Sequence, residues 1–97
     1  MTDRTESAAV ECLALAAALD NGTVTHGLRA HVAWRLFNVP GEHMMRAPID
    51  YVLDMVFAVQ RGKATASGLR AFVGDLRDGA AEMVAQSWYR QAYGGAV

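Results

Sequence analysis

The side chains of this chain that could take part in chemistry are three histidines, a single cysteine and a few carboxylates. His26 and His31 are five positions apart, a spacing that does not bring them to one face of a helix, and His43 follows beyond a turn. Because no cysteine or carboxylate cluster joins the histidines, the sequence predicts no metal site. We expect the histidines at the surface or at an interface, where they can make pH-dependent contacts.

The remaining candidate groups favour structural roles. Cys12 lies among alanines and leucines without a neighbouring cation to lower the pKa of its thiol, so we expect a buried, inert thiol. Arg46, Asp50 and Asp54 follow one another at four-residue intervals, which predicts a solvated charged stripe on a helix rather than a catalytic pair. There is no phosphate-binding glycine loop and no serine–histidine–aspartate pattern. We therefore expect a protein that is not an enzyme and uses no cofactor.

Composition indicates a small protein with an excess of apolar surface. The 97 residues suffice for one helical domain over residues 1–97, and 53% of them are hydrophobic against 20% charged. A net charge of −1 provides no general attraction to nucleic acid or anionic lipid. The longest apolar run, residues 12–19, is far shorter than the roughly 20 residues that cross a bilayer. With one cysteine and an N-terminus unlike a signal peptide, the sequence predicts a cytoplasmic protein without a membrane partner.

Glycine and proline separate segments of helical periodicity, and no alternating β-branched run persists, so we predict an all-α fold. The fold should be a compact bundle of four or five short helices. The expected helices cover about residues 5–20, 25–37, 42–61 or 48–61, 66–77 and 79–93. The third of these has the widest apolar face, so we expect it at the centre of the bundle.

Four positions carry local expectations about these helices. Pro48 either begins the third helix at its first position or kinks it there. Thr65 and Asp78 are expected to cap the starts of the last two helices. Gly74 falls inside a helix, where glycine costs about 1 kcal/mol, and is expected to mark close packing by a neighbour.

The first two expected helices each show two apolar faces, a pattern typical of a helix at the centre of a bundle or at an interface. Alanines, valines and leucines occur on both sides of each helix, and the second adds large aromatic residues. Aromatic residues and methionine are enriched where proteins bind one another. The expected apolar anchors of a protein interface are Leu15, Leu19, Trp34, Phe37, Met44 and Met45. Arg29 and Arg35 are expected on its polar rim, where they would set orientation.

Residues 32–46 resemble a helix-turn-helix motif. A small residue, Ala33, and Leu36 precede a turn. An apolar residue, Val39, follows, and then a recognition helix whose inward residue is Met44. Phe37 occupies a turn position where glycine is usual. The resemblance implies that a short second helix would enter the DNA major groove. It implies base contacts from His43 and Arg46 and a phosphate contact from Arg35 or Arg29.

The sequence therefore supports two functional hypotheses. The first is a small regulator that binds a larger protein stoichiometrically and sequesters or blocks it, such as a transcription regulator or a defence complex. Antiactivators of bacterial transcription regulators and phage inhibitors of host defence act in this general way. The alternative is a dimeric helix-turn-helix regulator that binds DNA. In both cases we expect a homodimer, with the first or second helix supplying the self-contact.

Overall fold

A computed structural model describes the backbone of residues 4–37 and 46–94. Every element in these two ranges is helical, which confirms the all-α prediction. The elements are α1 (Arg4–Asn21), α2 (His26–Phe37), α3 (Arg46–Gln60), α4 (Ser67–Arg77), α5 (Ala81–Tyr89) and the short π-helix η1 (Arg90–Gly94). None of the helices described is long and apolar enough to cross a membrane.

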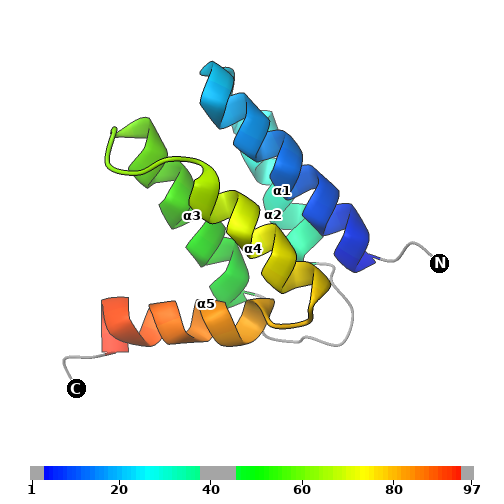
Figure 1. Cartoon of the computed structure of the whole chain (residues 1–97), viewed down its shortest axis with the longest axis vertical. Coiled ribbons are helices and arrows are strands. Elements are labelled where there is room, and N and C mark those ends of the chain that lie inside the picture. Colours follow the sequence, from blue (N-terminus) through cyan, green and yellow to red (C-terminus); the bar gives the residue numbers. More distant parts are fainter. Residues whose placement is uncertain (1–3, 38–45, 95–97) are drawn as a thin grey trace.

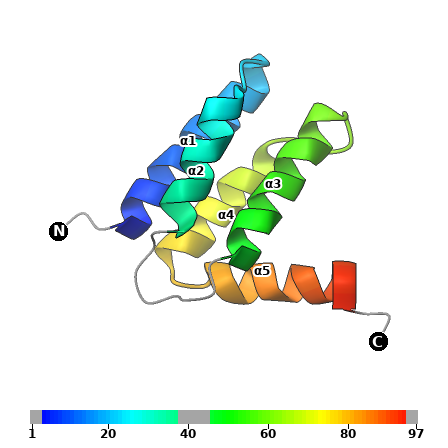
Figure 2. The same cartoon turned by 180° about the vertical axis from the view of Figure 1, so that it is seen from behind.

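Four of the helices run roughly alongside one another, and the fifth crosses the lower ends of two of them. Figure 1 shows α4 between α1 and α3, with α5 across the ends of α3 and α4. From behind, α2 and α3 lie side by side and run in opposite directions (Figure 2). Within the described residues, α3 is the one helix in contact with all four other α-helices, as its wide apolar face predicted.

The centre of the core is the interface between α1 and α4. Leucine, valine and phenylalanine side chains of α4 are buried against a face of α1 that is mostly alanine, where small side chains permit close approach. The α1 residues are Ala8, Ala9, Cys12, Leu15 and Ala16, and those of α4 are Leu69, Phe72, Val73 and Leu76. The edge of the Phe72 ring meets Tyr51 of α3 with ring centroids 5.1 Å apart, which joins the third helix to this core.

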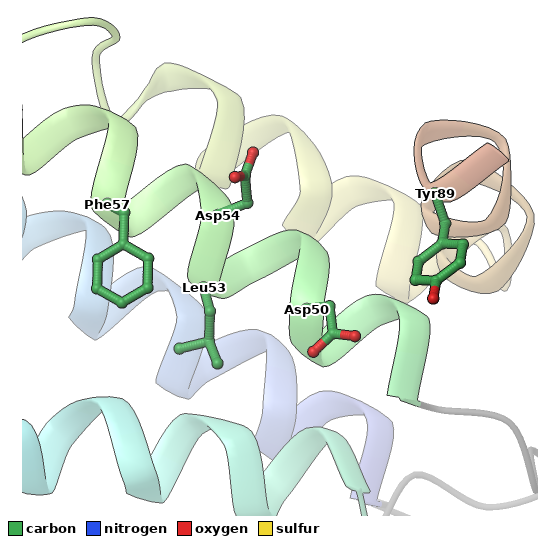
Figure 3. Close-up of a pocket in the computed structure, with 5 residues that line it drawn as sticks. All are labelled: Asp50, Leu53, Asp54, Phe57 and Tyr89. Atoms are coloured by element: carbon green, nitrogen blue, oxygen red, sulfur yellow. The ribbon is translucent and has the colours of Figure 1, made fainter. Parts of the chain in front are cut away.

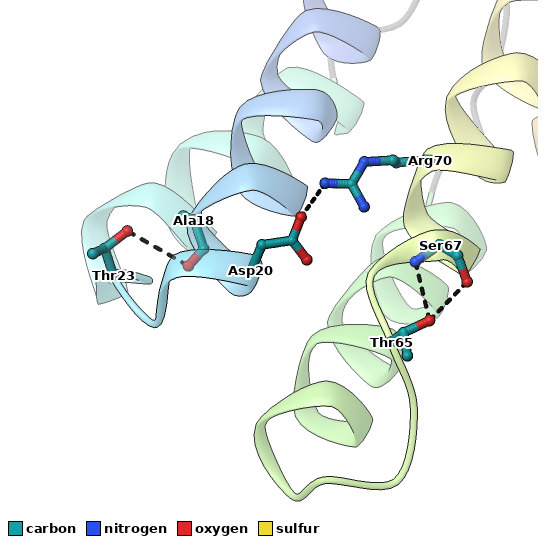
Figure 4. Close-up of polar contacts among 6 residues, drawn as sticks. All are labelled: Ala18, Asp20, Thr23, Thr65, Ser67 and Arg70. Carbon is teal, nitrogen blue, oxygen red and sulfur yellow. Dashed lines mark hydrogen bonds and ion pairs between the residues drawn. The ribbon is translucent and has the colours of Figure 1, made fainter.

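Two ion pairs connect α1 to α4 at opposite ends of their contact. Asp20, near the end of α1, pairs with Arg70 (Figure 4). Near the start of α1, Glu6 accepts two hydrogen bonds from Arg77, from Nε at 3.0 Å and from Nη2 at 2.8 Å. Both pairs are solvent-exposed, so they add less to stability than to the alignment of the two helices.

The turns between helices use local hydrogen bonds and left-handed glycines. The Thr25 hydroxyl accepts a hydrogen bond from the Leu28 amide at 3.0 Å and so caps the start of α2. Gly22 and Gly62 follow α1 and α3 with φ of 69° and 74°, a conformation that other residues adopt at a cost. Pro48 is the third residue of α3, where its missing amide hydrogen leaves no helical hydrogen bond unmade.

Three local expectations were wrong. Ala66, not Thr65, is the N-cap residue of α4, and the Thr65 hydroxyl bonds instead to Ser67 (Figure 4). Asp78 is the C-cap of α4 rather than a cap of α5, because the chain makes a further turn before α5 begins at Ala81. A methyl group added at Gly74 would meet nothing within 4 Å, so this glycine does not mark a close helix contact.

Candidate functional site

The second helix divides sharply into a buried face and an exposed face. Val32 and Leu36 are buried in the core, as their four-residue spacing predicts. On the outer side, Trp34 is 56% exposed and Phe37 is 69% exposed. Large aromatic residues at neighbouring positions of one solvent-facing helix are typical of protein-binding surfaces. We call Trp34 and Phe37 the aromatic pair.

The indole of Trp34 is held in position by its neighbours. The imidazole of His31 stacks on it, with ring centroids 6.4 Å apart and an interplanar angle of 20°. The Arg35 guanidinium carbon lies 5.3 Å from the centre of the same indole, within cation–π range. His31 is itself fixed from α1, where Oε2 of Glu11 lies 3.0 Å from its Nε2. An exposed side chain ordered in this way loses little conformational entropy on binding.

Two hollows border side chains of α3, one between α2 and α3 and the other between α3 and α5. One hollow of about 240 Å³ is lined by His26, Arg29, Ala30, Ala33, Leu53 and Phe57. A second of about 320 Å³ is lined by Asp50, Leu53, Asp54, Phe57 and Tyr89 (Figure 3). Leu53 and Phe57 line both hollows, and we call the two hollows together the α2/α3 groove.

The charges of the α2/α3 groove are separated along its length. Asp50 and Asp54 lie in the first half of α3, where they border the second hollow. Arg29 lies beside the other end of α3, since its Nη1 donates a hydrogen bond to Oε1 of Gln60 at 3.5 Å. Figure 3 shows Asp50 and Phe57 on one edge of α3 and Asp54 on the opposite edge. We call the hollow lined by the two aspartates the acidic end of the groove and the hollow lined by Arg29 its basic end, with Leu53 and Phe57 shared between them.

The expected interface residues of α1 are buried or half-buried, whereas those described on α2, Trp34 and Phe37, are exposed. Leu15 is fully buried at 0% exposure, and Leu19 is half-buried against the core. Leu15 therefore cannot serve as an exposed anchor, and Leu19 offers little surface for one. The two apolar faces of α1 were recognised correctly, but the inward face is the one that carries these leucines. The exposed residues of the other face are Val10, Leu13, Ala14 and Ala17.

The structure also places the two arginines expected on an interface rim. Arg29 lines the first hollow of the α2/α3 groove, and Arg35 lies beside Trp34. His43, Met44 and Met45 lie outside the described residues. Arg46 is the first residue of α3, and its side chain also lies outside the described part. The helix-turn-helix geometry implied for residues 32–46 is therefore untested.

The lining of the groove by Phe57 and Tyr89 was not predicted. Phe57 belongs to the wide apolar face of the third helix, but its ring is exposed because α3 buries Val52 and Val56 instead. The signal was present in the width of that apolar face, which exceeds what one packed side of a helix can bury. Tyr89 reaches the groove because α5 crosses the end of α3, and no sequence pattern specifies that crossing.

Cys12, the one cysteine of the sequence, is unsuited to nucleophilic chemistry. Cys12 is buried, and burial, with a smaller contribution from the charge of Glu11, raises the pKa of its thiol to about 12. A thiol that stays protonated at neutral pH is a poor nucleophile. Among residues 4–37 and 46–94, no three histidine, cysteine or carboxylate side chains are grouped as metal ligands would be.

Comparison of the chain with known protein families, with characterised proteins and with solved structures found no match.

Proposed function

We propose that this protein acts without catalysis, by binding a larger protein stoichiometrically through the aromatic pair on α2. The observation that carries the proposal is the exposure of Trp34 and Phe37 on a helix whose other face is firmly buried. A monomeric helical protein gains nothing in stability from two large exposed aromatic side chains. Such residues are the usual source of binding energy at protein interfaces.

The surroundings of the aromatic pair supply orientation as well as affinity. Arg35 lies over the Trp34 indole and His31 beside it, so charged groups border the apolar anchor. Polar and charged groups at the edge of an interface discriminate between partners more than they add to affinity. This arrangement suits a protein that sequesters or blocks one larger partner, such as a transcription regulator or a defence complex.

Capture from extracts of the native host, with the purified chain as bait, tests the proposal. The Trp34→Ala variant should weaken capture by about 2–4 kcal/mol, as expected for the loss of a binding hot spot. Met83→Ala is the matched control, because Met83 is as exposed as Phe37 but lies on α5, away from the aromatic pair. The captured species should be one protein in a fixed molar ratio to the bait.

Nuclease treatment and added salt distinguish this function from DNA binding. A protein complex centred on Trp34 should survive nuclease and depend weakly on salt. If the captured material is nucleic acid and its binding falls steeply with salt, the helix-turn-helix alternative is favoured. Equal capture by the Trp34→Ala and Met83→Ala variants would also contradict the proposal.

A further inference from the structure

We propose that the α2/α3 groove is the surface through which two copies of this chain associate, with Arg29 of each copy entering the acidic end of the other's groove. The groove adjoins the aromatic pair but is lined by different residues. Self-association and capture of a larger partner can therefore be tested separately.

The placement of charge is the first reason for a second copy. Helices α2 and α3 are antiparallel, so the start of α2 lies beside the end of α3 (Figure 2). The hydrogen bond from Arg29 to Gln60 fixes this register. Asp50 precedes Gln60 by ten positions, which is about 15 Å along a helix. Cation and carboxylate therefore occupy diagonally opposite corners of one face.

A diagonal arrangement of opposite charges is complementary to itself. When two such faces meet about a twofold axis that lies in the plane of the face, perpendicular to the line from Arg29 to Asp50, the basic corner of each copy lies against the acidic corner of the other. Both contacts form together, and each copy supplies one cation site and one carboxylate site. The face that matches this charge pattern most directly is therefore a second copy of the same face.

The acidic end of the groove has the chemistry that an arginine requires. Asp50 and Asp54 border a hollow of about 320 Å³ whose other walls include the rings of Phe57 and Tyr89. Carboxylates accept charge-assisted hydrogen bonds from a guanidinium, and aromatic rings attract its charge and its flat faces. Arg29 of the second copy can use both interactions at once.

The apolar middle of the groove supplies the remaining surface. Ala30 and Ala33 on α2 are small, so a second copy could approach the backbone of α2 closely. Leu53 and Phe57 on α3 would then leave water on association. A domain of 97 residues buries a smaller share of its chain than a larger one does, which favours dimers that cover such surfaces.

Charge exchange tests the proposal without depending on the stability of a single variant. The Arg29→Asp chain places carboxylates at both ends of the groove, and the Asp50→Arg/Asp54→Arg chain places cations at both ends. Each chain alone should dimerise about a hundredfold more weakly than the native chain, because like charges then face one another. In an equimolar mixture both contacts become attractive again, so the mixture should dimerise as the native chain does.

Sedimentation equilibrium of each chain and of the mixture measures these outcomes. Asp78→Arg, which reverses an exposed charge in the turn after α4, is the control and should leave the native dimer unchanged. A native chain that stays monomeric at every soluble concentration overturns the proposal, as does a mixture no more dimeric than its components. A monomer that still captures a protein through Trp34 overturns self-association alone, and a dimer that captures none overturns the proposed function alone.

Discussion

Nε2 of His31 on α2 lies 3.0 Å from Oε2 of Glu11 on α1, and the same imidazole stacks on the indole of Trp34. The His31 side chain thus contacts α1 through Glu11 and also orders the exposed ring of Trp34. The contact agrees with the rotation of α2 on α1, in which Leu36 is turned inward and Trp34 outward.

Removal of the His31 ring should loosen Trp34 without unfolding the protein. In a Trp88→Phe background, which leaves one indole, His31→Ala should increase the local mobility of Trp34 because its stacking partner is gone. Time-resolved fluorescence anisotropy measures this mobility. His26→Ala, which also removes an exposed imidazole from α2, is the control. Equal anisotropy decays in the two variants would show that His31 does not order the indole.

Adjacent residues of α2 should differ greatly in their contribution to stability. Leu36 is 0% exposed and Phe37 is 69% exposed. Leu36→Ala should lower the free energy of unfolding by about 2–5 kcal/mol, because it removes buried methyl groups and leaves a cavity. Phe37→Ala should change it by about 0.5 kcal/mol or less, although phenylalanine is the larger side chain. Urea denaturation of dilute protein measures both, and comparable losses would contradict the orientation of α2.

Replacement of two glycines by alanine should change the stability of the protein in opposite directions. Gly74 lies in the interior of α4, and an added methyl group meets no atom within 4 Å, so Gly74→Ala should stabilise the protein by about 1 kcal/mol. Gly62 has a φ of 74°, and Gly62→Ala should destabilise it by about 1 kcal/mol or more. Thermal and chemical unfolding of the two variants measure the sign of each change in stability. A destabilising Gly74→Ala would indicate a neighbour that packs on α4.

The buried thiol should make stability fall at alkaline pH. The pKa of Cys12 is near 9 in the unfolded chain and is raised to about 12 in the folded protein. Between these values the unfolded state loses a proton that the folded state keeps, so deprotonation favours unfolding. The free energy of unfolding is therefore unaffected by ionisation of this thiol below pH 9. Above pH 9 it falls by up to about 1.4 kcal/mol per pH unit.

The Cys12→Ala variant isolates that contribution. Its free energy of unfolding should decline less steeply above pH 9 than that of the native chain, whatever its stability at neutral pH. Tyr51, whose pKa is also raised by burial, titrates in both proteins and cancels from the comparison. A thiol reagent should label the native chain at neutral pH only as fast as the chain opens. Parallel pH profiles, or rapid labelling, would show that Cys12 is accessible.

Helix positions and the identity of most core residues could be predicted from local pattern. The spacing of Leu69, Phe72, Val73 and Leu76 permits one buried face on α4, and the structure buries all four. Helix ends were less predictable, because the side chain that would cap a helix best does not always stand at the N-cap position. At the start of α4 the N-cap is the apolar Ala66, although the neighbouring Thr65 has the side chain that usually caps a helix.

What the amino-acid sequence determined by itself is the helical class, because a 3.6-residue apolar period and helix-terminating glycines are local properties of the chain. It also showed that the first helix has two apolar faces. Only the tertiary structure decided which face is covered: α4 packs on the side with Leu15, and Val10 and Leu13 stay exposed. The α2/α3 groove has the same origin, since its lining residues Arg29, Asp50 and Tyr89 come from three helices that only the packing of distant segments brings side by side.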